Sequence, residues 1–220
     1  MFGLFKKAKN NISVNSITVP NLGWHLADQR SSIVVYLNET ESASLSVNYF
    51  AKQPDLPTAK DIEFLKSYYR ELIYPNNGGL IETDCVTLNG ITAVKAIFKI
   101  RQPAGMAYVA SVTIPFRDFS FVVKLQAIET GVTGIRDAVV AEKLLQRNEI
   151  SIGEHGFLNW FSDPYDKNIT NGVLMNQSEQ QQYDAEFPSH PLTIIRQGIN
   201  KIVSEIQFTS EVLNSAPFQK

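Results

Sequence analysis

The sequence predicts an α+β protein in which one antiparallel β-sheet of about six to seven strands packs against helices. Residues 85–128 contain three consecutive β-type runs, and the turns between them are too short for the crossovers of a parallel sheet. Residues 33–49 add a second hairpin with alternating polarity. Two further segments, 62–72 and 192–206, repeat apolar residues at the three- and four-residue steps of a helix face.

The first turn of the three-strand meander is predicted at Asn89-Gly90. Both central positions of a type I′ hairpin turn need a positive φ, and this dipeptide tolerates it. In the strand that follows, four apolar residues share one parity: Val94, Ala96, Phe98 and Ile100. Lys95, Lys99 and Arg101 share the other, which predicts one buried and one solvated face.

Turns at 103–105 and 117–118 separate the next two strands. Their predicted buried rows are Tyr108, Ala110, Val112, Ile114 and Phe116, and then Phe119, Phe121, Val123, Leu125 and Ala127. Thr133 is a suitable N-cap for a helix from about Ile135 to Arg147.

Before the meander, residues 13–20 are predicted to form a short edge strand and residues 27–31 a polar turn. Thr58 and Asp61 resemble a capping box at the start of a helix. The apolar face of that helix comprises Ile62, Leu65, Tyr69 and Leu72.

Residues 151–188 form a long extension with no steady period, apart from a possible short helix around 178–183. Ser189 and Pro191 then begin the last helix, whose apolar stripe is Leu192, Ile195, Ile199, Ile202 and Ile206. We therefore expect a single domain, 1–220, with a core over 13–150, a C-terminal helix over 190–208 and the extension between them.

Composition narrows the function classes. The 220 residues carry a net charge of −2 with no block of like charges, so nucleic-acid binding is not expected. The one cysteine, Cys85, lies in a predicted strand and is expected to be a buried apolar residue. There is no apolar run of transmembrane length and no export signal, which predicts a cytoplasmic location. A short membrane-surface anchor at residues 2–9 is the alternative for the N-terminus.

The order of elements, together with Gly23-Trp24 and the hairpins at Asn89-Gly90 and Arg117-Asp118, resembles the PsbP-like α/β/α sandwich. That fold includes DcrB-like bacterial proteins and chaperones of type VI secretion effectors. The resemblance covers roughly residues 13–150. It implies a non-catalytic protein-binding module.

The sequence offers candidates for three kinds of reactive site: a hydrolase site, an anion site and a metal site. None of the three histidines lies in a hydrolase signature, so no catalytic residue is predicted. Residues 130–134 could hold an anion with help from Arg136, but a glycine-assisted turn and cap is the favoured interpretation, and Glu129 would repel the anion. A metal set can be drawn from Glu154, His155, Asp163, Asp166 and His190, but its spacing is irregular, and neither a metal nor a cofactor is predicted.

The candidate binding residues are Trp160, Phe161, Tyr165, Arg136 and His155. The aromatic residues can anchor a protein partner or fix the extension to its own sheet. If Trp160 is an anchor, Trp160→Ala should abolish partner binding and leave the melting temperature nearly unchanged. The leading hypothesis is an adaptor, chaperone or immunity-type factor with an unidentified protein partner. The alternative is an enzyme or small-molecule-binding protein with a pocket beneath the extension, built around Glu129, Arg136 and His155.

Overall fold

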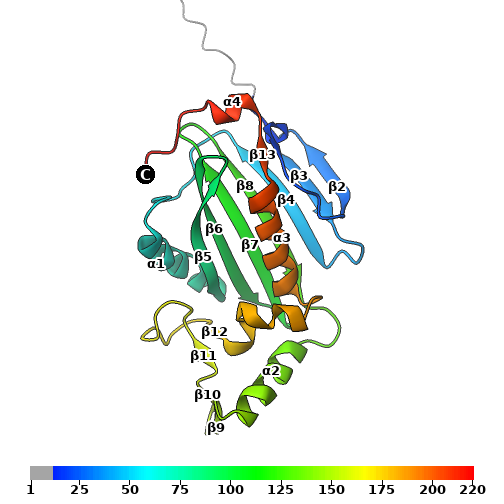
Figure 1. The fold of residues 1–220 in the computed structure, drawn as a ribbon, viewed down its shortest axis with the longest axis vertical. Coiled ribbons are helices and arrows are strands. Elements are labelled where there is room, and N and C mark those ends of the chain that lie inside the picture. Colours follow the sequence, from blue (N-terminus) through cyan, green and yellow to red (C-terminus); the bar gives the residue numbers. More distant parts are fainter. Residues whose placement is uncertain (1–11) are drawn as a thin grey trace, which may run out of the picture.

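A seven-stranded antiparallel sheet forms the centre of the computed structural model, which describes residues 12–220. The strands lie in the order β2–β3–β4–β8–β7–β6–β5 (Figure 1). Their bounds are β2 His25–Arg30, β3 Ile33–Leu37, β4 Ala43–Phe50, β5 Gly78–Leu88, β6 Ile91–Arg101, β7 Met106–Pro115 and β8 Ser120–Ile128. The predicted fold class is confirmed. The membrane-surface anchor expected at residues 2–9 lies outside the described residues.

The predicted hairpins of the meander are present. Asn89 and Gly90 have φ values of 49° and 86°, as a type I′ turn requires. The side-chain amide of Asn89 also donates to the carbonyl of Ile206, 3.0 Å away, which connects this turn to the C-terminal end of the helix Pro191–Glu205. Between β7 and β8, the N–H of Phe116 donates to the carbonyl of Phe119 over 2.9 Å.

Helices cover both faces of the sheet. Helix α3 (Pro191–Glu205) lies across β7 and β8, and its isoleucine stripe joins the main core, which also contains Ile97 (Figure 1). Helix α1 (Ile62–Ile73) packs against β5, and its cluster contains Val94 and Phe98. Because neighbouring residues of a strand point to opposite faces, the two helices lie on opposite sides of β6. The predicted solvated face of β6 is therefore wrong.

Other local predictions also need correction. Residues 13–20 form a 3-10 turn, η1 (Val14–Ser16), and β1 (Ile17–Thr18), which pairs with β13 (Gln207–Phe208) outside the main sheet. The expected polar turn at 27–31 belongs largely to β2, an edge strand that is mostly exposed and ends in the polar residues Asp28, Gln29 and Arg30. Leu72 is exposed, although the apolar spacing of α1 placed it on the buried face.

One end of the sheet carries an additional unit, residues 135–187, which we call the end module (Figure 1). Its elements are α2 (Ile135–Gln146), β9 (Ser151–Gly153), β10 (Gly156–Leu158), β11 (Phe161–Ser162), β12 (Met175–Asn176) and the 3-10 turns η3 (Gln177–Glu179) and η4 (Gln181–Glu186). A separate apolar cluster holds it together: Val140, Ala141, Leu144, Ile150, Trp160 and Tyr183. The N-cap of α2 is Gly134, in a left-handed conformation, and not the predicted Thr133.

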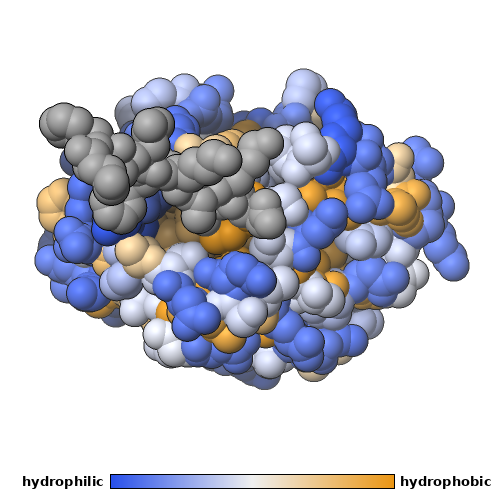
Figure 2. All heavy atoms as spheres, turned by 90° about the horizontal axis from the view of Figure 1, so that it is seen from above, coloured by the Kyte–Doolittle hydropathy of each residue, from blue (hydrophilic) through white to orange (hydrophobic). Residues whose placement is uncertain are grey.

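The opposite end of the molecule carries α4 (Ser210–Leu213). Seen from this end, the surface formed by residues 12–220 is mostly hydrophilic, with smaller apolar areas between the polar side chains (Figure 2).

The short turn η2 (Tyr74–Asn76) follows α1. Within the described chain, no helix combines the length and the hydropathy that a bilayer crossing requires.

Candidate functional site

Exposed apolar side chains gather on the hairpin and the short strand of the end module. Ile152 is 77% exposed, Phe157 39%, Leu158 56% and Phe161 57%. We call these four residues the tip surface. Ile152 and Phe157 are paired across the β9–β10 hairpin, which places their side chains on one face. Leu158, the neighbour of Phe157 in β10, points to the other face of the hairpin, so both faces carry an exposed apolar side chain.

Trp160 supports the tip surface from beneath. Its side chain is only 5% exposed and belongs to the end-module core, with Tyr183 in the same cluster. Its ring contacts those of Phe157 and Phe161 edge-on, at centroid distances of 6.0 and 6.3 Å. Of the two roles considered for Trp160, its burial favours packing, and the two exposed phenylalanines lie on either side of it.

The end module is joined to the sheet by buried charges. Glu179 of η3 is 0% exposed and Lys99 of β6 is 1% exposed, and Nζ of Lys99 lies 2.6 Å from Oε2 of Glu179. The same carboxylate accepts from the hydroxyl of Tyr108 over 3.1 Å and from the backbone N–H of Asn176 over 2.7 Å. Each oxygen therefore has a partner, as a buried carboxylate requires.

A second buried centre surrounds Asp184 of η4. Arg136 of α2 and Arg196 of α3 both donate to its carboxylate, at 2.9 and 2.8 Å. Arg196 also donates to Glu82 of β5. Helix α2, turn η4, helix α3 and the sheet thus share one set of charge-assisted bonds, which fixes the register of the end module.

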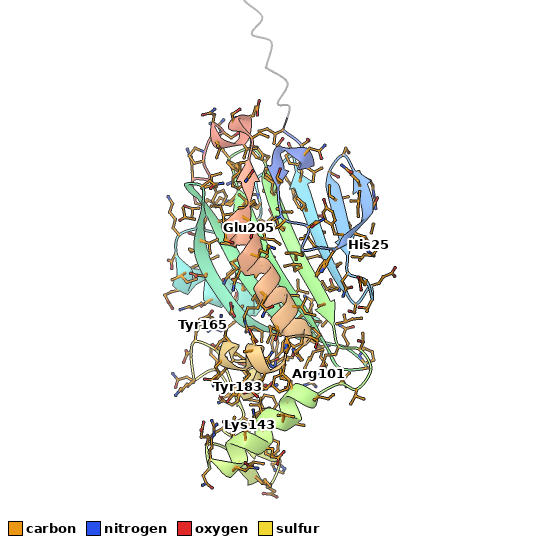
Figure 3. All side chains as sticks on the ribbon, turned by 45° about the vertical axis from the view of Figure 1, so that its right-hand side comes forward. His25, Arg101, Lys143, Tyr165, Tyr183 and Glu205 are labelled. Carbon is orange, nitrogen blue, oxygen red and sulfur yellow. The ribbon has the colours of Figure 1, made fainter. Side chains whose placement is uncertain are left out.

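The segment after the tip surface attaches to α1 and β5. Both oxygens of Asp163 accept from Arg70, at 2.5 and 2.7 Å. Although burial acts to raise the pKa of Asp163, the Arg70 bonds and two backbone N–H groups lower it below the ordinary value. Tyr165 lies beside β5 (Figure 3), and its hydroxyl bonds to both the N–H and the carbonyl of Thr83, in the middle of that strand. This contact satisfies the backbone groups of Thr83 on the free edge of β5.

A cavity of about 420 Å³ opens on another side of the end module, between the end of β8, the start of α2 and the residues leading into α3. Glu129 and Arg136 both line it. The Glu129 carboxylate accepts from the N–H groups of Met106 and Gly134, at 2.8 and 3.2 Å. The negative group at the start of α2 is therefore the chain's own, which supports the turn interpretation of residues 130–134 over an anion site.

The residues predicted for the alternative pocket are separated. His155 lies in the exposed turn of the β9–β10 hairpin, whereas Glu129 and Arg136 line the cavity by α2. Arg136 is 1% exposed and committed to Asp184 and to the carbonyls of Ser178 and Gln180. The structure thus brings Phe161 close to Trp160 and places Tyr165 at the edge of β5. His155 lies apart from Glu129 and Arg136, with which it was expected to form a pocket.

The candidate metal residues are likewise dispersed. Asp163 is bound to Arg70, and the imidazole of His190 lies 3.6 Å from Glu129. Between Ile12 and Lys220, no three His, Cys, Asp or Glu side chains are grouped closely enough to hold an ion.

Sequence reasoning missed Ile152, Phe157 and Leu158 because three-residue strands are too short to show a period. The available signal was Phe157-Leu158, one residue after the polar turn Glu154-His155. It also missed Lys99 and Arg196 as buried charges, because their ion partners are 80 and 12 residues away in the chain.

No protein-family model and no curated protein matches this chain. Three solved structures with similar folds are the Ran-binding protein Mog1p of Saccharomyces cerevisiae, the cyanobacterial PsbP protein CyanoP of Synechocystis and LpqN of Mycobacterium tuberculosis. Mog1p is 12% identical over 90% of this chain and 93% of its own, with a TM-score of 0.47. CyanoP is 14% identical over 60% and 85%, with a TM-score of 0.38. LpqN is 18% identical over 60% and 78%, with a TM-score of 0.28.

A PsbP protein is thus among the matching structures, in line with the resemblance seen in the sequence. Each of these TM-scores is below 0.5 and each identity below 20%, so these proteins assign no function to this chain.

Proposed function

We propose that the chain is a non-catalytic, cytoplasmic protein-binding module, an adaptor or chaperone-type factor that holds a protein partner on its tip surface. The main support for this proposal is the exposure of Ile152, Phe157, Leu158 and Phe161 on a small unit with its own core. Burying such side chains against a partner releases about 1.5–3 kcal/mol for each one fully covered. The partner is a protein segment that presents apolar side chains.

The residues beneath the tip surface hold it in place, as binding a partner requires. Phe157 and Phe161 contact the buried ring of Trp160, which restricts their motion before a partner arrives. The ion pairs of Glu179 and Asp184 hold the module on the sheet. A preorganised apolar surface loses less conformational entropy on binding than a flexible one.

The experiment is affinity capture from the native host, with the tagged full-length chain and two variants. Phe157→Ser/Phe161→Ser removes the aromatic part of the tip surface. Leu26→Ser is the matched control, because Leu26 is 52% exposed on the distant strand β2. Anchor residues contribute about 2 kcal/mol or more, which corresponds to roughly thirtyfold in affinity.

A partner retained by the wild type and by Leu26→Ser, but lost from the double variant, supports the proposal. Equal recovery of the same proteins by all three chains contradicts it. Melting curves of the three chains establish that each one is folded.

A further inference from the structure

The cavity beside α2 is lined by both apolar and charged side chains. Its walls are mainly apolar and include Ile128, Val132, Ile135, Phe187, Pro188 and Ile194. Two of these apolar side chains are accessible to solvent: Val132 is 79% exposed and Ile135 is 53% exposed. The cavity volume of about 420 Å³ suits a small organic molecule or a single long side chain.

A carboxylate lies among these apolar walls. The side chain of Glu129 is 11% exposed, so it is mostly withdrawn from water yet still reachable from the cavity. The neighbouring His190 imidazole and the N–H groups of Gly134 and Met106 lower the pKa of Glu129 against the opposing effect of burial. The carboxyl group is therefore ionised at neutral pH.

The negative charge of Glu129 is not neutralised by a permanent cation. No Lys or Arg side chain within residues 12–220 forms an ion pair with it. Arg136, which also lines the cavity, is bound to Asp184, and Glu186 at the rim is paired with Lys143. His190 lies 3.6 Å from Glu129.

The two ring nitrogens of His190 have different partners. Its Nδ1 accepts the N–H of Leu192 at the start of α3, so the ring hydrogen is on Nε2, the atom that faces Glu129. The imidazole therefore directs Nε2 toward the carboxylate of Glu129. A negative charge beside apolar walls remains, and it attracts a positive group more strongly than an equivalent charge in water.

We propose that this cavity binds an organic cation, an ammonium or guanidinium group carried on an aliphatic chain. The chain would lie along Val132 and Ile135, and the cation would donate to the Glu129 carboxylate. The source is either a free aliphatic amine or the lysine side chain of a protein. This site is independent of the tip surface, because none of its lining residues belongs to it.

The test uses hexylammonium chloride, titrated into the isotope-labelled full-length chain and followed by NMR. Binding at millimolar concentration should shift the amide signals of Val132, Gly134 and Ile135. Hexanol and sodium hexanoate are the matched ligands, with the same chain and no positive charge. Ligands this small bind weakly, so the comparison between them carries the information.

Two charge-removing variants locate the interaction. Glu129→Gln should weaken hexylammonium binding about tenfold, because a bond to a charged acceptor becomes a bond to a neutral one. Glu186→Gln removes the same charge from the rim, where it is exposed and paired with Lys143, and should change the affinity by less than about twofold. Should Glu129→Gln fail to fold, Ile135→Ser on the exposed face of α2 provides the second variant and should weaken binding severalfold.

The tripeptide acetyl-Leu-Lys-Leu-amide separates the two sources. Tighter binding of the tripeptide than of hexylammonium identifies a protein lysine, and the reverse identifies a free amine. Hexanol binding as tightly as hexylammonium, or equal affinities for the wild type, Glu129→Gln and Ile135→Ser, overturns the proposal. Loss of the tip surface leaves these results unchanged, so the two proposals fail separately.

Discussion

Removing the Glu179 carboxylate tests how the end module is held. In Glu179→Ala, the ammonium of Lys99 remains buried without its counter-ion, and the hydroxyl of Tyr108 and the N–H of Asn176 lose their acceptor. Breaking a buried ion pair by deleting one partner costs about 3–5 kcal/mol. We therefore predict a decrease of that size in the free energy of unfolding, measured by urea denaturation with circular dichroism.

A matched control and a double-mutant cycle complete this test. Glu186→Ala removes a carboxylate from the exposed pair with Lys143 and should cost no more than about 1 kcal/mol. Lys99→Met, combined with Glu179→Gln, should give a coupling energy within the roughly 0.5–3 kcal/mol seen for contacting residues. A loss below about 1 kcal/mol in Glu179→Ala, or no coupling, would refute the role assigned to this pair.

Three further changes follow from the structure. Trp160→Ala should lower the free energy of unfolding by about 3–5 kcal/mol in urea, because the ring fills the end-module core; this departs from the sequence-based expectation of an unchanged melting temperature. Gly79→Ala should cost about 1–3 kcal/mol and speed proteolysis of the loop at 163–174, because a Cβ would lie 1.8 Å from the carbonyl oxygen of Val173. The lowered pKa of Asp163 stabilises the fold above the unfolded value of about 3.9, and this contribution is lost as the pH falls through the folded value. The acid limb of the stability profile should therefore be shallower in Asp163→Asn, and an unchanged limb would contradict the assignment.

Local rules were sufficient for much of the sheet. Asn89-Gly90 predicted its hairpin because turn chemistry depends on two adjacent residues. The apolar spacing of α3 likewise predicted a buried stripe from Leu192 to Ile206. These signals lie within short stretches of sequence, so no long-range contact is needed to interpret them.

The buried charges were missed because their partners are distant in the sequence. Lys99 was assigned to a solvated face because lysine is normally exposed, yet it meets Glu179 from the segment that showed no period. Arg196 lies beside the isoleucine stripe of α3 and is likewise buried because it pairs with a carboxylate of the end module, that of Asp184. The end module is attached to the sheet by charge pairs, and charge pairs leave no periodic pattern in a sequence.

Photo-cross-linking from the tip surface tests the central claim most directly. A benzophenone amino acid would replace Phe161 in one full-length chain and Leu26 in another, and each would be irradiated in the native host. We predict a covalent adduct with a second protein from position 161 and a much lower yield from position 26. Equal yields at the two positions, or no protein adduct from position 161, would contradict a partner-binding tip surface.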